Sequence, residues 1–162
     1  MEDSIFQIIE EVWTSFVGIK LERRSEQELS SLKGYFLLAS IEIDGAWKGE
    51  VVLFCSEPLA HRITAHLFEM EPAEVSMEDV SETLGEINNI ISGNLKRLLP
   101  EPCYLSVPSV GYKKNALENI KTIANYNATK VLAVCEEHFI VVMLIMYPEK
   151  WTMEIDSCPR PS

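Results

Sequence analysis

The chain has few of the features that mark nucleic-acid-binding or membrane-binding proteins. Lysine and arginine number 14 against 25 aspartate and glutamate residues, which gives a net charge of -11. Phosphate backbones and anionic lipid surfaces repel such a chain at long range. We therefore expect neither a nucleic acid nor a membrane among its partners.

Long hydrophobic runs are also missing. The longest strongly apolar run, Phe139 to Tyr147, is of strand length and far short of the roughly 20 residues that cross a bilayer. The first residues are acidic where an export signal carries positive charge. The sequence therefore predicts a cytoplasmic protein in which this run forms a buried strand.

Disulfide and metal-binding patterns are absent as well. The four cysteines are widely spaced and form no C-x-x-C pair: Cys55, Cys103, Cys135 and Cys158. His61 and His66 are five residues apart, which separates them around a helix, and His138 stands alone. We expect reduced thiols, no metal site and no cofactor of the protein's own.

The first half of the chain predicts a helix, a hairpin and a second helix. A helix after Asp3 or Ser4 is indicated by apolar residues that share one face: Ile5, Ile8, Ile9, Val12 and Phe16. Residues 18–24 are compatible with a short strand, and residues 25–34 with a turn or loop. Two β-rich runs around Asp44-Gly45 predict an antiparallel hairpin. Ser56 as N-cap and Pro58 in the first turn predict a short helix after it.

The second half repeats the order of helix and hairpin. A long helix is predicted from about Met77 to Leu98, where Ser76 and Asp79 form an acidic variant of the capping box. Residues 103–110 predict one strand with Pro108 near its end, whereas residues 111–128 give mixed signals. Two apolar runs joined around Glu136 and Glu137 predict a second hairpin.

This order predicts an α+β fold of two layers. We expect an antiparallel sheet packed by two long helices, with a loose internal duplication of helix plus hairpin. Residues 1–150 would form a single domain, and residues 151–162 a proline-rich C-terminal tail.

The long helix contains two glycines, and each costs about 1 kcal/mol relative to alanine in a helix interior. A helical wheel gathers one apolar stripe: Val80, Leu84, Ile87, Ile91, Leu95 and Leu98. The opposite side carries polar and small residues: Glu82, Glu86, Asn89, Gly93 and Lys96, with Gly85 and Ser92 at the border. A small residue on an exposed face lets another backbone approach closely. This pattern favours a docking face, although an ordinary solvated surface would also fit, because E-x-x-N alone is a weak pattern.

The stretch GEINNIISGN closely resembles the signature helix of the CheX, CheC and FliY family of phosphatases for chemotaxis response regulators. The resemblance is carried by E-x-x-N followed four residues later by G-N, at Glu86, Asn89, Gly93 and Asn94. The first helix has no E-x-x-N, so the chain resembles the CheX-like members, which keep one such site. Two departures concern Glu82, where the longer family pattern has Ser or Asp, and Pro108, which is nearer than that pattern expects.

The resemblance implies hydrolysis of the aspartyl phosphate of a CheY-like receiver domain that brings its own magnesium ion. Asn89 would orient the attacking water and Glu86 would contact the receiver's lysine. The surrounding partner-docking residues would be Glu82, Gly85, Gly93 and Lys96.

The resemblance also suggests a homodimer, which the strand Phe139 to Met146 would support if it lies at a sheet edge. Two alternatives to an enzyme remain. One is a non-catalytic adaptor that binds a receiver domain or a flagellar-motor component, and the other is a purely structural dimer.

Overall fold

The computed structural model describes residues 1–123 and 127–148. Cys158 and the predicted tail at 151–162 lie outside the described residues. Seven strands form one sheet with antiparallel pairing throughout. They are β1 (Glu22–Arg24), β2 (Phe36–Gly45), β3 (Gly49–Ser56), β4 (Cys103–Leu105), β5 (Ser109–Lys113), β6 (Asn127–Cys135) and β7 (His138–Met146).

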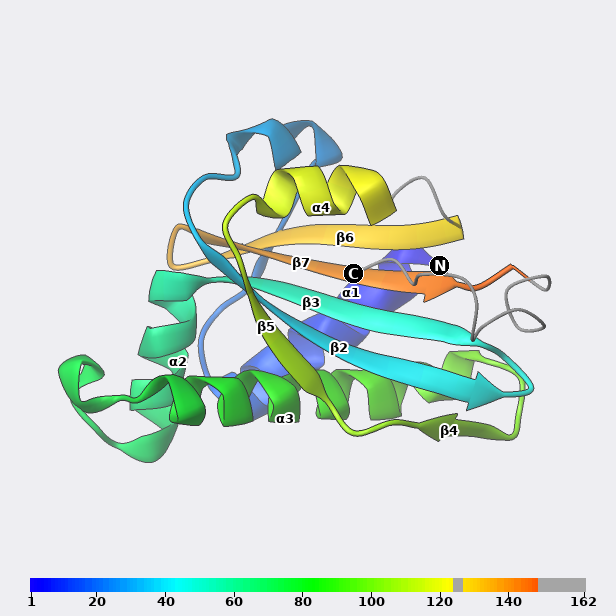
Figure 1. Ribbon diagram of the computed structural model, residues 1–162, viewed down its shortest axis with the longest axis horizontal. Coiled ribbons are helices and arrows are strands. Elements are labelled where there is room, and N and C mark those ends of the chain that lie inside the picture. Colours follow the sequence, from blue (N-terminus) through cyan, green and yellow to red (C-terminus); the bar gives the residue numbers. More distant parts are fainter. Residues whose placement is uncertain (124–126, 149–162) are drawn as a thin grey trace.

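Four α-helices flank the sheet: α1 (Glu2–Val12), α2 (Glu57–Phe68), α3 (Met77–Leu95) and α4 (Ala116–Ile123). Figure 1 shows α1 and α4 on opposite sides of the strands. Three short segments are 3-10 turns: Glu26–Ser31, Pro72–Glu74 and Lys96–Leu98. No helix in the described part of the chain is long and apolar enough to cross a membrane.

The sheet is covered on both faces because the central strands are apolar on both. Along β3, Val51, Leu53 and Cys55 face the core shared with α1, α2 and α3, whereas Val52 and Phe54 face the core shared with α4. The predicted α+β fold and antiparallel sheet are confirmed. The structure adds α4 as a partial third layer, formed by residues whose sequence gave mixed signals.

The sheet order is β1-β6-β7-β3-β2-β4, with β5 also paired to β2. β7 therefore lies between β6 and β3 and is the buried strand that its apolar run predicts, so it does not occupy the sheet edge on which its support for a homodimer depended. Its long apolar run reflects burial on both faces within one chain. The homodimer loses this support and stays a prediction.

Both predicted hairpins are present, but the first turn lies further along the chain. β2 runs through Asp44 and Gly45, and residues 46–48 form the connection to β3. Gly45 has φ of +117°, and a Cβ there would meet the carbonyl oxygen of Pro102 at 2.4 Å. The glycine is thus required by its conformation and by close packing. In the second hairpin Glu136 and Glu137 both have positive φ and form the turn between β6 and β7.

The first helix differs from prediction at both ends. It begins at Glu2 with Met1 in the N-cap position, so neither Asp3 nor Ser4 caps it, and Asp3 instead pairs with Arg23 at 2.6 Å. A π-helical segment, Trp13–Val17, follows α1 and turns Trp13 and Val17 into the core. Phe16, predicted on the buried face, is left only half buried.

Proline divides the strand predicted at residues 103–110 into β4 and β5. Both pair with β2, at its end and at its start respectively. Between them the Ser106 hydroxyl accepts a hydrogen bond from the Glu42 backbone at 2.9 Å. Pro108 follows, which has no N–H to donate to a ladder. The chain therefore leaves the sheet and re-enters it beside α3, as Figure 1 shows.

Candidate functional site

The long helix α3 begins as the sequence predicts and ends earlier. Ser76 accepts a hydrogen bond from the backbone N–H of Asp79 at 3.1 Å, and the Asp79 carboxylate accepts one from the N–H of Ser76 at 3.3 Å, a capping box. The helix then changes to a 3-10 turn at Lys96. That change rotates Leu98 off the apolar stripe and leaves it 41% exposed, so its predicted burial is wrong.

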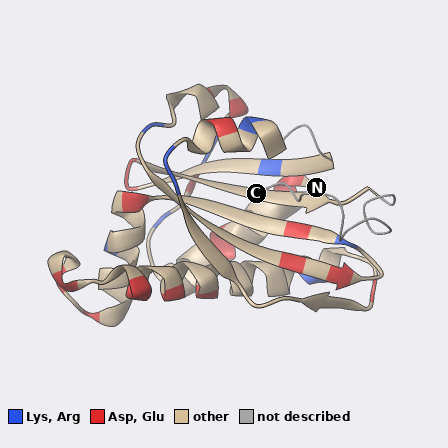
Figure 2. Ribbon diagram, viewed as in Figure 1, with Lys and Arg blue, Asp and Glu red and all other residues tan. Residues whose placement is uncertain are grey.

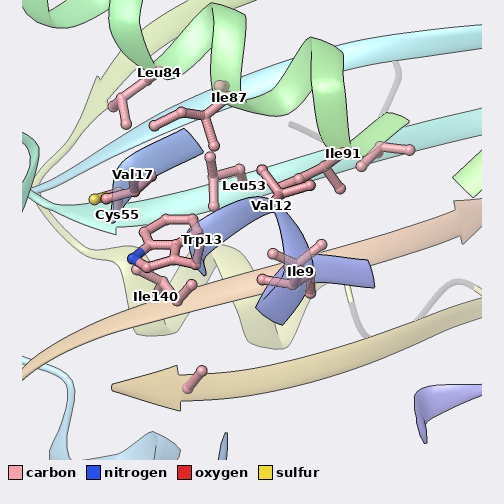
Figure 3. Close-up of a cluster of buried hydrophobic side chains, with 14 of the residues drawn as sticks. Ile9, Val12, Trp13, Val17, Leu53, Cys55, Leu84, Ile87, Ile91 and Ile140 are labelled. Carbon is pink, nitrogen blue, oxygen red and sulfur yellow. The ribbon is translucent and has the colours of Figure 1, made fainter. Parts of the chain in front are cut away.

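One side of α3 is fully buried, and this burial makes the opposite side of the helix face the solvent. Val80, Leu84, Ile87, Ile91 and Leu95 are all 0% exposed. Figure 3 shows three of them pointing into the core formed with α1 and β3. As predicted, Glu86 and Asn89 are exposed. At a spacing of three residues, their side chains are neighbours, with Cβ atoms about 5–6 Å apart.

Asn88, on the buried side of α3, anchors the helix to the sheet, a role that the sequence interpretation did not predict. Its fully buried amide donates to the backbone carbonyls of Ala39 on β2 at 3.0 Å and Val51 on β3 at 3.1 Å. The Ser92 hydroxyl donates to its Oδ1 at 3.2 Å. These bonds use both hydrogens of the buried amide and one of the two acceptor sites of its oxygen, and they fix α3 against two central strands.

The two helical glycines have different surroundings. At Gly93 a Cβ would find nothing within 4 Å, so nothing within the described residues explains its small size. At Gly85 a Cβ would lie 3.2 Å from the Cβ of Pro108 and 3.8 Å from a methyl group of Val110. Gly85 is buried and admits the segment that leads into β5. Packing against Pro108 therefore explains the small size of Gly85, and its part in partner docking stays a prediction.

The other predicted docking residues remain accessible to different degrees. Glu82 and Gly93 are exposed, and Lys96 is half buried. Asn94 of the motif is half buried, with its amide donating to the Ile90 carbonyl at 2.8 Å and its oxygen accepting from Arg97. Asn94 thus holds the end of the helix. We define the candidate docking face, called the docking face below, as the exposed residues Glu82, Glu86, Asn89 and Gly93.

The docking face is acidic toward its N-terminal half. Figure 2 shows acidic residues following one another along that part of α3, which carries Glu78, Asp79, Glu82 and Glu86. A basic group on a partner surface would be attracted to this half of the helix. The C-terminal half presents the neutral Asn89 and Gly93.

A pocket of about 810 Å³ adjoins the docking face. Its apolar lining comes from the π-helical segment, the end of α2 and the region of β5: Phe16, Leu67, Phe68, Pro108 and Val110. Its α3 wall consists of Ser81, Glu82, Thr83, Gly85 and Glu86. The pocket and the docking face therefore share two carboxylates.

A buried acid elsewhere does not belong to this site. Glu50 on β3 is 4% exposed, and burial raises the pKa of its carboxyl group. The Tyr147 hydroxyl donates to its Oε2 at 3.0 Å. Successive side chains along β3 point to opposite faces of the sheet, and Val51 points to the α3 side. Glu50 therefore lies with Val52 on the α4 side.

The docking face offers an amide and carboxylates but no group arranged as a nucleophile. A carboxamide cannot take up a proton at neutral pH, although it can donate and accept hydrogen bonds at once. Such a face can position a water molecule against an already reactive bond. The reactive bond and its activating groups would then have to come from a partner.

Comparison with known protein families shows which family this chain belongs to. The family model described as "Chemotaxis phosphatase CheX" matches residues 37–129, more than half of the chain. The chain belongs to the CheX family. A search of curated proteins found no match.

Solved structures of CheX proteins have the same fold. CheX of Vibrio vulnificus is 16% identical, with a TM-score of 0.70 over 90% of this chain and 95% of that chain. A CheX-CheY-BeF3-Mg complex of Borrelia burgdorferi gives 19% identity and a TM-score of 0.65 over 90% of this chain and 97% of that chain. Thermotoga maritima FliY is similar at 16% identity and a TM-score of 0.57, over 90% and 89% of the two chains. At these identities the likeness concerns the fold.

Proposed function

We propose that this protein hydrolyses the aspartyl phosphate of a CheY-like receiver domain. The observation that carries the proposal is the exposure of Glu86 and Asn89, one helical turn apart, on a face where Gly93 leaves room for a partner. Membership of a chemotaxis phosphatase family supports it. So does the similar CheX protein whose complex contains CheY, BeF3 and magnesium.

The chemistry needs little from this chain because an acyl phosphate is already activated. Asn89 accepts and donates hydrogen bonds to hold a water molecule in line with the phosphorus atom. The water oxygen attacks phosphorus while the bond between phosphorus and the aspartyl oxygen breaks. The aspartyl oxygen keeps the bonding electron pair as a free carboxylate on the receiver, and both protons of the water stay on the inorganic phosphate that leaves. The receiver's magnesium ion and lysine balance the charge on the phosphoryl oxygens. Glu86 contacts that lysine and fixes the register of the two proteins.

The proposal is tested by phosphorylating the CheY-like receivers of the same cell and following phosphate release with and without this protein. We expect accelerated release from at least one receiver. Binding without acceleration would instead identify the non-catalytic adaptor. A protein that neither binds nor accelerates any receiver would contradict both readings and leave the structural dimer.

Replacement of Glu86 should affect affinity and turnover together. Glu86→Gln keeps the size of the side chain and removes its charge, so we expect binding of the phosphorylated receiver to weaken by about 1–3 kcal/mol. Turnover at saturating receiver should also fall. Affinity measured at two salt concentrations checks the cause, because loss of a charge pair reduces the salt dependence of binding.

Glu78→Gln is the matched control for this change. Glu78 is exposed on the first turn of α3, about two turns from Glu86. Glu78→Gln should leave receiver affinity and turnover unchanged. Equal effects at both positions would indicate a general influence of negative charge and no specific contact by Glu86.

Replacement of Gly93 should separate docking from stability. Gly93→Ala should raise the free energy of unfolding by up to about 1 kcal/mol, because alanine is the better helix former and the added Cβ meets nothing. Gly93→Leu should instead raise the Kd for the receiver by about tenfold or more, since its side chain occupies the approach path. Urea unfolding and receiver titration measure the two effects.

Gly111→Leu is the matched control, because a Cβ at Gly111 on β5 also meets nothing within 4 Å. It should not change receiver affinity. If Gly93→Leu binds as tightly as the wild-type protein, the docking face does not include Gly93.

A further inference from the structure

The pocket beside Glu86 has a form that the proposed chemistry does not require. Hydrolysis needs the exposed amide of Asn89, whereas this pocket lies toward the start of α3 and is lined mainly by apolar side chains. Phe68 stands at its wall and is 41% exposed. Solvated apolar surface of this kind, next to a charged rim, is typical of an interaction site.

The pocket also contains a polar group without a partner. Thr83 lines it and is 4% exposed, and its hydroxyl oxygen has no hydrogen-bond partner among the described residues. A buried hydroxyl without a partner costs free energy. The Thr83 oxygen is itself inaccessible to solvent, so a bound group can pair with it only after a local rearrangement of the pocket wall.

We infer that this pocket receives an apolar segment of the receiver, flanked by a basic residue, when the receiver docks on α3. The inference rests on the proposed function and names the second contact of the same partner. Continuity favours this occupant, because Glu82 and Glu86 belong both to the docking face and to the wall of the pocket. The two carboxylates are complementary to lysine or arginine beside the apolar segment.

The volume of the pocket favours a segment of the receiver over a single side chain as its occupant. A volume of about 810 Å³ accommodates several side chains. An apolar patch that is buried at the centre of an interface and bordered by charges is the usual arrangement of residues that dominate binding. The pocket would therefore determine which receiver binds, whereas Asn89 would determine how fast it loses phosphate.

The test is a variant that fills the pocket from α3. Ser81 lines it and is only half buried, so Ser81→Trp should place an indole in the pocket without disturbing the core. We expect the Kd for the receiver that the wild-type protein dephosphorylates fastest to rise about tenfold or more, with turnover at saturating receiver changed less than about twofold. Ser30→Trp, at an exposed position in the Glu26–Ser31 turn, is the matched control and should bind like the wild type.

The outcomes separate this inference from the proposed function. If the wild-type protein dephosphorylates a receiver and Ser81→Trp binds that receiver with unchanged affinity, the inference about the pocket is overturned. The proposed phosphatase function then still holds. A lower oligomeric mass of Ser81→Trp in light scattering, with receiver affinity unchanged, would assign the pocket to a second copy of the chain. A wild-type protein that accelerates no receiver would overturn the function and this inference with it.

Discussion

Asn89→Ala is expected to lower the turnover of the phosphorylated receiver by about 10²–10³-fold, the usual effect of removing one preorganised hydrogen-bonding group from a reaction centre. Its affinity for the receiver should change little, because the carboxamide acts chiefly on water in the transition state. Asn89 is exposed on α3, so the substitution should also leave stability within about 0.5 kcal/mol of wild type. Single-turnover phosphate release, receiver titration and urea unfolding measure the three quantities.

Two companion variants make this result specific. Asn89→Asp keeps the shape but presents a negative charge to a phosphoryl group, so its turnover should be at least as low as that of Asn89→Ala. Asn115→Ala changes another exposed asparagine, beside α4 on the other side of the sheet, and should leave turnover unchanged. Full activity of Asn89→Ala would contradict the assigned role. Equal losses of turnover and affinity would show that Asn89 acts in docking.

Asn88→Ala should destabilise the folded protein by about 2–4 kcal/mol, since it removes buried hydrogen bonds and leaves a small cavity. The carbonyls of Ala39 and Val51 lose their shared donor, and the Ser92 hydroxyl loses its acceptor. Asn88→Asp should be worse still, because its carboxylate would face two carbonyl oxygens in a site that is 0% exposed. Urea unfolding gives the free energies directly.

The neighbouring Asn89→Ala is the control for this stability effect. The two asparagines are adjacent in sequence, but one is fully buried and the other exposed. We expect a difference of about 2 kcal/mol or more between their alanine variants. Similar stabilities would mean that the buried amide does not anchor α3 as its hydrogen bonds indicate.

Much of α3 could be predicted because its signals are local. The capping box, the apolar stripe and the exposed positions of Glu86 and Asn89 all follow from spacing along one helix. Asn88 was missed although a signal exists. It lies four residues after Leu84 and three before Ile91, which places an asparagine within the apolar stripe.

The remaining differences depend on contacts between distant parts of the chain. Gly85 is small because Pro108 packs on it, and no periodicity along either segment reports that contact. β4 and β5 are two strands because each pairs with a different part of β2. The π-helical segment after α1 likewise follows from packing, since Trp13 and Val17 both enter the core there. The pocket is built from these same elements, so it could not be predicted from sequence.

The most direct test of the central claim is the structure of this protein bound to a receiver that carries magnesium and beryllofluoride in place of the phosphoryl group. We predict that the receiver covers α3, with the Asn89 carboxamide reaching the beryllofluoride directly at about 3 Å or through one water molecule. Glu86 should lie opposite the receiver's lysine. A complex in which the receiver binds elsewhere and Asn89 remains open to solvent would contradict the account.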